Sequence, residues 1–268
     1  MESGLENRVV LVTGASGGIG SSMVRAFLAE DSKVAVHYGN QRDSAEKLAT
    51  ESLGRAIAFQ ADLTQEAEVE RLFGDIESEL GPVECVIANA GIWPAENVPI
   101  HEMTLTQWNR TLAVDLTSVF LTMRRFFIGI KNFGLKDPSA VLIGSTAAVF
   151  GEAGHVDYAA AKAGMSYGML QTLKNEISQL ARSGRVNAVC PGWVMTPMAQ
   201  KFAEDRESKA RALQTIPMQK FGQPEDIAAS AVFLSSPRLS GHLTGQRLVV
   251  SGGMEGRVLY PPGECDNL

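Results

Sequence analysis

Three residues in the second half of the chain have side chains suited to proton transfer: Ser145, Tyr158 and Lys162. A phenol exchanges protons near neutral pH only if its ordinary pKa of about 10 is lowered. Tyr158 and Lys162 are four residues apart in a segment predicted to be helical, so both side chains lie on one face and the ammonium charge favours the phenolate. We therefore expect Tyr158 to act as a general acid or base. Composition alone gives a Tyr-x-x-x-Lys spacing about once per several hundred residues, so this prediction needs support from the rest of the chain.

The elements that position these residues follow from the pattern of apolar residues along the 268-residue chain. Strands are predicted at 9–12, 33–37, 55–60, 83–88, 140–144, 185–189 and 247–250. Helices are predicted at 19–30, 43–52, 66–80, 106–131, 158–181 and 225–234. Several strands are apolar on both faces, which is typical of a parallel sheet covered by helices on both sides. The sequence therefore predicts a single α/β domain over residues 1–254, Rossmann-like and doubly wound, with a seven-stranded parallel sheet.

Two segments fall outside this alternation of strands and helices. Residues 196–217 are charged on one side and follow a predicted strand, so we expect an inserted helical hairpin. Such a hairpin is either a lid over a substrate site or a surface helix pair with no role. Residues 255–268 contain Pro261-Pro262-Gly263 and are predicted to form a C-terminal tail.

Charge and cysteine content argue against several classes of function. The 24 basic and 30 acidic residues give a net charge of −6 without long runs of either sign, so we expect no nucleic-acid partner and no membrane association. No apolar run approaches the roughly 18 residues of a membrane-spanning helix, and the first residues lack a signal-peptide pattern. Cys85, Cys190 and Cys265 fit neither a disulfide framework nor a metal cluster. We therefore expect a cytoplasmic protein without a metal.

A glycine-rich turn follows the first predicted strand and leads into a helix. It reads Thr13-Gly14-Ala15-Ser16-Gly17-Gly18-Ile19-Gly20. Glycine lets backbone N–H groups approach a phosphate closely, and a helix N-terminus adds partial positive charge. The order of strand, loop and helix therefore favours a dinucleotide-binding turn over an ordinary glycine turn.

The spacing Thr-Gly-x-x-x-Gly-x-Gly resembles that of the short-chain dehydrogenase/reductase family, and further motifs follow in the family's order over residues 8–254. They are Asp62-Leu63, Asn89-Ala90-Gly91, Ser145, Tyr158 with Lys162, Pro191-Gly192 with Thr196, Thr244-Gly245 and Gly252-Gly253. The chain is similar in particular to 3-oxoacyl-(acyl-carrier-protein) reductases. The resemblance implies a nicotinamide dinucleotide cofactor bound by Gly14, Ser16, Gly18, Ile19, Gly20, Asp62, Leu63, Asn89, Ala90, Gly91, Tyr158, Lys162, Pro191, Gly192, Val194 and Thr196.

The same resemblance implies the roles of the catalytic residues. Tyr158 would exchange a proton with the oxygen of a ketone or secondary alcohol while hydride passes between the carbon and the nicotinamide. Ser145 would hold that oxygen by a hydrogen bond, and Lys162 would lower the pKa of Tyr158 and bind the nicotinamide ribose.

The family's fourth catalytic residue is usually an asparagine, and this chain has Asp115 at that position. The contact that the family's residue makes to a relay water runs largely through its backbone carbonyl, which an aspartate keeps. A carboxylate there would also stabilise the charged form of Lys162. We expect Asp115 to belong to the relay, and the alternative is an ordinary helix residue.

The end of the second predicted strand bears on the choice of cofactor. NAD-binding units usually carry an acidic residue there that holds the ribose 2′-hydroxyl. In this chain Asp43 comes too late, and with Glu46 it is predicted to form a capping box for the next helix. A 2′-phosphate would meet no negative charge, and we expect His37, Asn40 or Arg42 to bind it. The sequence therefore favours NADP(H), with NAD(H) as the alternative.

Candidate substrate-binding residues follow the ends of the motifs and are mostly apolar or aromatic. They are Trp93, Phe150, His155, Trp193 and Met198. This set indicates a neutral, partly apolar ketone or a 3-oxoacyl group, and the alternative is that these side chains belong to the core.

The predicted helices 106–131 and 158–181 carry long apolar faces. They include Phe120, Leu121, Phe126, Phe127 and Leu170. In the family the corresponding helices pair across a dyad, so a homotetramer or homodimer is expected. The alternative is that these faces are buried within one subunit.

Three functions are compatible with these motifs. The first is an NADP(H)-dependent carbonyl reductase or alcohol dehydrogenase. A sugar-nucleotide epimerase shares Tyr-x-x-x-Lys, but such proteins are longer and space their glycines differently. A non-enzymatic NADP-binding protein is disfavoured by the intact Ser145, Tyr158 and Lys162, although Asp115 leaves it open.

Overall fold

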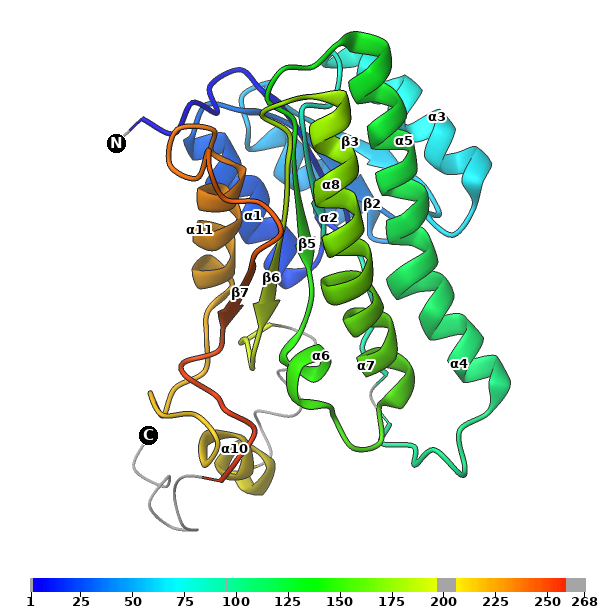
Figure 1. Cartoon of the computed structure of the whole chain (residues 1–268), viewed down its shortest axis with the longest axis vertical. Coiled ribbons are helices and arrows are strands. Elements are labelled where there is room, and N and C mark those ends of the chain that lie inside the picture. The colour runs from blue at the N-terminus through cyan, green and yellow to red at the C-terminus, as the bar shows by residue number, and fades with distance from the viewer. Residues whose placement is uncertain (1, 95, 197–205, 259–268) are drawn as a thin grey trace.

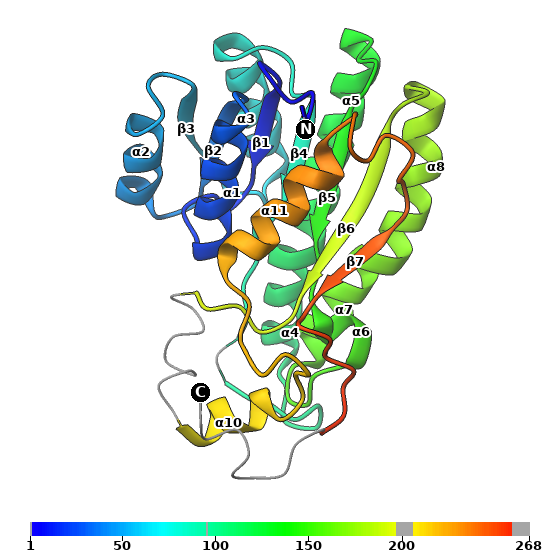
Figure 2. The ribbon, with the colours of Figure 1, turned by 90° about the vertical axis from the view of Figure 1, so that its left-hand side faces the viewer.

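A seven-stranded parallel sheet forms the centre of the molecule in the computed structural model, which describes residues 2–94, 96–196 and 206–258 (Figures 1 and 2). The strands are β1 (Val9–Val12), β2 (Lys33–Tyr38), β3 (Ala56–Gln60), β4 (Cys85–Ala88), β5 (Ser139–Ile143), β6 (Arg185–Pro191) and β7 (Arg247–Val250). Their order in the sheet is β3-β2-β1-β4-β5-β6-β7, and every pairing is parallel. The predicted doubly wound α/β fold is confirmed.

Helices cover both faces of the sheet (Figures 1 and 2). They are α1 (Gly18–Ala29), α2 (Arg42–Thr50), α3 (Glu66–Glu79), α4 (Leu105–Leu112), α5 (Ser118–Phe133), α6 (Thr146–Phe150), α7 (Val156–Ala163), α8 (Leu170–Leu180), α10 (Arg206–Leu213) and α11 (Pro224–Ser235). Residues of α1, α2 and α11 share one core cluster with Val10 and Val12 of β1, whereas α3, α5 and α8 share the other with Val9 and Leu11. Successive strand residues point to opposite faces, so two-sided burial explains the continuous apolar run of β1.

The helices differ from their predicted form in three respects. Each of the two long predicted helices contains a π-helical segment, η1 (Ala113–Thr117) between α4 and α5 and η2 (Gly164–Met169) between α7 and α8. The short helix α6 was not predicted. The predicted capping box of Asp43 and Glu46 is wrong, because α2 already begins at Arg42, whose Nε donates to Glu46 Oε1 at 2.6 Å.

The chain changes direction across the sheet between β1 and β4, which are neighbours although β2 and β3 come between them in sequence. Thr13 follows β1, Asn89 follows β4, and the two are joined by hydrogen bonds: Asn89 N donates to Thr13 Oγ1 at 2.9 Å and Asn89 Nδ2 to the Thr13 carbonyl at 3.0 Å. In open α/β sheets ligands bind outside the carboxyl ends of the strands at such a switch point. The fold therefore predicts a ligand site at the carboxyl ends of β1 and β4.

The predicted insertion at 196–217 contains α10, which lies beyond the carboxyl ends of β6 and β7 in both views (Figures 1 and 2). Leu213 and Ile216 from this segment pack with Trp193, which follows β6. The division into a domain over 1–254 and a tail over 255–268 stays a prediction. None of the helices in the described part of the chain combines the length and apolar character needed to cross a membrane.

Candidate active site

One cavity of about 260 Å³ lies at the carboxyl ends of β1, β4, β5 and β6. It is lined by residues at and after the ends of these four strands, by the first turn of α1 and by the first two turns of α7. The predicted site residues among them are Gly14, Gly18, Ile19, Gly20, Asn89, Ala90, Gly91, Trp93, Ser145, Tyr158, Lys162, Pro191, Gly192, Trp193, Val194 and Thr196. The fold thus gathers residues that are up to 182 positions apart in sequence, from Gly14 to Thr196, around one space.

The glycine turn after β1 forms a cradle of suitable shape for a dinucleotide. Gly14 has a φ of 61°, and a Cβ at this position would lie 2.8 Å from Ala90 Cα, so the turn can approach the β4 loop only without a side chain. Gly17 precedes α1 as its N-cap, and Gly18 and Ile19 begin its first turn. The N–H groups of a first helical turn have no partner within the helix and lie at its positive end. These features fit the pyrophosphate of a nicotinamide dinucleotide.

His37 stabilises the glycine turn by a hydrogen bond that its ring accepts. The side chain is buried, its Nδ1 accepts a hydrogen bond from Gly14 N at 3.0 Å, and its Nε2 donates to the Ala61 carbonyl at 3.0 Å. Burial lowers the pKa of His37 to about 4, so the ring is neutral at physiological pH. The proposed binding of a 2′-phosphate by His37 does not fit this geometry, because both ring nitrogens are engaged and the ring carries no charge.

The other residues predicted near the adenosine end lie outside the cavity lining. Asn40 and Arg42 are exposed at the start of α2, and Ser16 is half-buried in the glycine turn. Asp62 Oδ1 accepts hydrogen bonds from Thr64 N at 2.9 Å and from Thr64 Oγ1 at 2.7 Å, so this carboxylate holds the turn after β3. Leu63 beside it is buried in the core.

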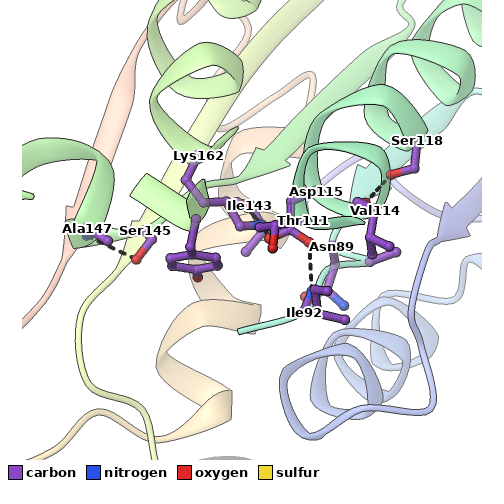
Figure 3. A network of polar contacts seen from close by, with 12 residues as sticks. Asn89, Ile92, Thr111, Val114, Asp115, Ser118, Ile143, Ser145, Ala147 and Lys162 are labelled. Carbon is purple, nitrogen blue, oxygen red and sulfur yellow. Dashed lines mark hydrogen bonds and ion pairs between the residues drawn. The ribbon is translucent and has the colours of Figure 1, made fainter. Parts of the chain in front are cut away.

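Lys162 lies almost fully buried one helical turn after Tyr158 on α7. Its Nζ donates to the Ile143 carbonyl at 3.1 Å, lies 3.9 Å from Asp115 Oδ2 and is 5.7 Å from the centre of the Tyr158 ring. Figure 3 shows Lys162, Ile143 and Asp115 converging from three different elements. The ammonium group therefore neutralises a buried carboxylate beside the phenol.

Asp115 is fully buried in η1. Its Oδ1 accepts a hydrogen bond from Ile92 N at 2.7 Å, and its Oδ2 has no hydrogen-bond partner among the described residues (Figure 3). Burial raises the pKa of Asp115, whereas the charge of Lys162 lowers it. A Cβ on Gly91 would lie 3.1 Å from Lys162 Nζ and 3.2 Å from Asp115 Oδ1, so the absence of a side chain there leaves room for the pair.

The Tyr158 hydroxyl is hydrogen-bonded to the side chain of Ser145. Ser145 follows β5 by two residues and caps α6 by accepting a hydrogen bond from Ala147 N at 3.1 Å (Figure 3). Burial raises the pKa of Tyr158 above its ordinary value, a hydrogen bond with the Ser145 hydroxyl lowers it, and the charges of Asp115 and Glu152 raise it further. The lowering of the Tyr158 pKa by Lys162 stays a prediction, and the ammonium group of Lys162 is directed at Asp115 and the Ile143 carbonyl. Tyr158 therefore keeps its proton at neutral pH and is suited to donate it.

Aromatic side chains form part of the cavity wall. The Trp93 ring stacks on His155 with 5.0 Å between centroids and 13° between planes, and it meets Trp193 edge-on at 6.4 Å. His155 is buried behind Trp93, and its Nε2 lies 2.8 Å from the Pro94 carbonyl. Phe150 lies against Gly256 rather than along the cavity. Met198 lies outside the described residues.

Two carboxylates near the site were not among the predicted residues. Asp157 is fully buried, accepts hydrogen bonds from Tyr158 N at 2.9 Å and Thr111 Oγ1 at 2.7 Å, and so ties the start of α7 to α4. Its place in the first turn of a helix is a common one for an acid, but the sequence pattern does not show which partner it meets. The second is Glu152, which lines the cavity between Ser145 and Tyr158 in sequence.

Comparison with known proteins agrees with this geometry over nearly the whole chain. A family model described as enoyl-(acyl carrier protein) reductase, of the short-chain dehydrogenase/reductase type, matches residues 14–255. The chain is similar to 3beta-hydroxysteroid dehydrogenase 1 of Eggerthella lenta, at 38% identity over 268 residues and 97% of each chain. It is also similar to a 3-oxoacyl-(acyl-carrier-protein) reductase of Synechocystis sp., at 33% identity over 255 residues, covering 93% of this chain and 98% of the relative.

Proposed function

The chain belongs to the short-chain dehydrogenase/reductase family, and we propose that it interconverts a ketone and a secondary alcohol with NADP(H), with Tyr158 as the general acid and base. It is an oxidoreductase by family. The observation that carries the proposal is the meeting of Ser145, Tyr158 and Lys162 in one cavity with the glycine turn after β1. The names of the two relatives, a dehydrogenase and a reductase, support chemistry at a hydroxyl or carbonyl group.

The chain's own residues have distinct tasks in holding the cofactor, which when bound supplies or accepts the hydride. The turn from Gly14 to Gly20 binds the pyrophosphate through its N–H groups. Lys162 would bind the nicotinamide ribose, and the loop from Pro191 to Thr196, which lines the same cavity, would hold the nicotinamide. Asn89 keeps the β1 and β4 ends together, since its Nδ2 donates to the carbonyls of both Thr13 and Gly14.

The proton is handled by Tyr158 with Ser145. In the reducing direction the neutral phenol donates to the carbonyl oxygen, and the Ser145 hydroxyl stabilises the negative charge that develops there. General acid catalysis of this kind accelerates a reaction roughly 10²–10⁴-fold. Asp115 and Lys162 complete the relay behind the phenol, 3.9 Å apart.

The cavity wall supports a neutral, partly apolar ketone or a 3-oxoacyl group as the substrate. Trp93 and Trp193 offer flat apolar surface, and His155 supports Trp93 from behind. Phe150, which does not line the cavity, stays a predicted substrate residue, as does Met198, which lies outside the described residues. NAD(H) as the cofactor and a non-enzymatic role are the alternatives, and the cytoplasmic location stays a prediction.

Replacing Tyr158 by phenylalanine tests the catalytic proposal. We expect Tyr158→Phe to lower kcat for ketone reduction by roughly 10²-fold or more, because the proton donor is removed. NADPH binding, followed by quenching of tryptophan fluorescence, should stay nearly unchanged. Tyr167→Phe is the matched control, since Tyr167 lies in η2 outside the cavity lining. Turnover by Tyr158→Phe at the rate of the unmodified protein would remove this residue from the mechanism, and no NADPH oxidation with any ketone of a broad panel would favour a binding protein.

Cofactor preference is tested by comparing kcat/KM for NADPH and NADH on one ketone. We expect at least a tenfold preference for NADPH, since β2 ends without an acid and Arg42 is exposed beside the predicted 2′-phosphate position. Arg42→Ala should reduce kcat/KM for NADPH and leave that for NADH unchanged. Arg25→Ala, an exposed arginine on α1, is the control. Equal or better activity of the unmodified protein with NADH would contradict the NADP(H) assignment.

Asp115 gives a prediction for pH dependence. Its charge raises the pKa of Tyr158, so Asp115→Asn removes that effect and lowers the Tyr158 pKa. Alcohol oxidation needs the phenolate, so we expect the acidic limb of kcat/KM for oxidation to move to lower pH in Asp115→Asn. Asp75→Asn, an exposed acid on α3, should leave the profile in place. An unchanged limb, or one moved to higher pH, would show that the Asp115 charge does not act on Tyr158.

We also propose that α5 pairs with a second copy of the chain. Of the predicted apolar face, Leu121, Phe126 and Leu170 are buried within the subunit, whereas Phe120 is 51% exposed. Phe133, the last residue of α5, is not part of the predicted face and is 50% exposed. Light scattering should therefore show a dimer or tetramer, and Phe120→Glu should lower the measured mass. Detection of the 28.7 kDa species alone in the unmodified protein would exclude the assembly.

A further inference from the structure

The cavity contains a carboxylate, Glu152, that the proposed proton transfer does not use. It lies in the loop between α6 and α7, so the chain carries it directly between Ser145 and Tyr158. Of the described residues that line the cavity, Glu152 and Lys162 have charged side chains. The charge of Lys162 is compensated by the Asp115 carboxylate at 3.9 Å. Glu152 is therefore the charged group that would face a substrate.

Contacts from the aromatic wall fix the orientation of Glu152. Trp93 Nε1 donates to Glu152 Oε1 at 3.2 Å, and His155 Nδ1 lies 3.7 Å from the same oxygen. The stacking of Trp93 on His155 holds both of these groups in place. Among the described residues these contacts are all made to Oε1, so Oε2 is available to a group of the substrate.

The surroundings of Glu152 decide what kind of group it accepts. Its side chain is 27% exposed and partly desolvated, and this burial raises the pKa of Glu152 above its ordinary value. Removing a carboxylate from water costs free energy unless a hydrogen-bond donor compensates for the lost water contacts. An anionic group placed beside the carboxylate is repelled. Aromatic rings on the same wall suit a flat, uncharged body. A hydroxyl group on an otherwise apolar ketone supplies the hydrogen-bond donor, carries no negative charge and leaves an apolar body to contact the aromatic wall.

We propose that Glu152 determines substrate specificity by accepting a hydrogen bond from a hydroxyl group that the substrate carries in addition to the reacting carbonyl. The proposal rests on the proposed ketone–alcohol chemistry of the same cavity. The substrate class that follows is an uncharged hydroxyketone, or in the other direction a diol, with an apolar skeleton. Glu152 acts here on substrate recognition, whereas Tyr158 and Ser145 act on the reacting oxygen.

The test compares one bicyclic ketone with its isomeric hydroxy derivatives, using NADPH oxidation by the full chain. We expect at least one isomer to exceed the parent ketone in kcat/KM by roughly tenfold or more, mainly through a lower KM. Glu152→Leu should bring that ratio close to one. Glu152→Gln keeps an oxygen acceptor for Trp93 Nε1 but removes the charge and replaces the second carboxylate oxygen by an NH2 donor, so its ratio should fall between the two. Because each ratio compares two substrates on the same enzyme, partial unfolding or a changed Tyr158 pKa cancels.

Each outcome decides the proposal. Loss of the hydroxyl preference in Glu152→Leu, with the parent ketone still reduced, supports it. A preference that survives in Glu152→Leu, or no preferred isomer in the unmodified protein while the parent ketone is reduced, overturns it and leaves the proposed function standing. No reduction of any member of the series by the unmodified protein, alongside turnover of unrelated ketones, overturns the hydroxyketone class alone. No turnover of any ketone contradicts the proposed function and this inference together.

Discussion

The buried ammonium group of Lys162 imposes the constraint on which the site depends. The residue is 4% exposed, and an unpaired charge in such a place costs several kcal/mol, of the order of 3–5 when a partner is removed. The fold meets this cost with the Ile143 carbonyl at the end of β5 and the Asp115 carboxylate in η1. One charge on α7 therefore holds the sheet edge and the α4–α5 helix in register around the cavity. Gly91 contributes to this arrangement, because a Cβ at this position would crowd both Lys162 Nζ and Asp115 Oδ1.

The electrostatic consequence reaches Tyr158. A lysine one turn away from a tyrosine suggests a stabilised phenolate, but here the lysine is matched by a carboxylate, and a second carboxylate, Glu152, faces the same cavity. Both charges raise the pKa of Tyr158, and burial raises it more. The Ser145 hydrogen bond is the local interaction that works in the opposite direction. The geometry thus favours a protonated Tyr158 phenol beside the Ser145 hydroxyl. In this form the phenol can donate its proton to a carbonyl oxygen during reduction.

The sequence predicts the sheet well and the polar contacts poorly, for physical reasons. Two-sided burial leaves a continuous apolar run, so β1 has the predicted bounds. β7 also has its predicted bounds, although its residues are exposed or half-buried in the subunit. Asn89, Ser145 and Lys162 line one cavity because strand ends and helix turns fix where such residues lie, and their roles stay predictions. His37 was misjudged because its polarity did not show that β2 turns the ring inward under Gly14. Asp157 is hydrogen-bonded to a residue of α4, and Glu152 to a residue of the loop after β4. Contacts between residues so far apart in the chain cannot be predicted from local spacing.

The segment from Ser145 to Tyr158 links chemistry to recognition. Its two ends supply the hydroxyl and the phenol, so its folded length sets their separation, and α6 with the following loop takes up the residues between them. The same loop carries Glu152 and His155, which the ring of Trp93 holds by a hydrogen bond and by stacking. A change in the length of this loop therefore acts on the substrate wall and on the positions of Ser145 and Tyr158 together. Specificity in this cavity is consequently easier to alter by changing the chemical type of one side chain, such as Glu152, than by changing the length of the loop.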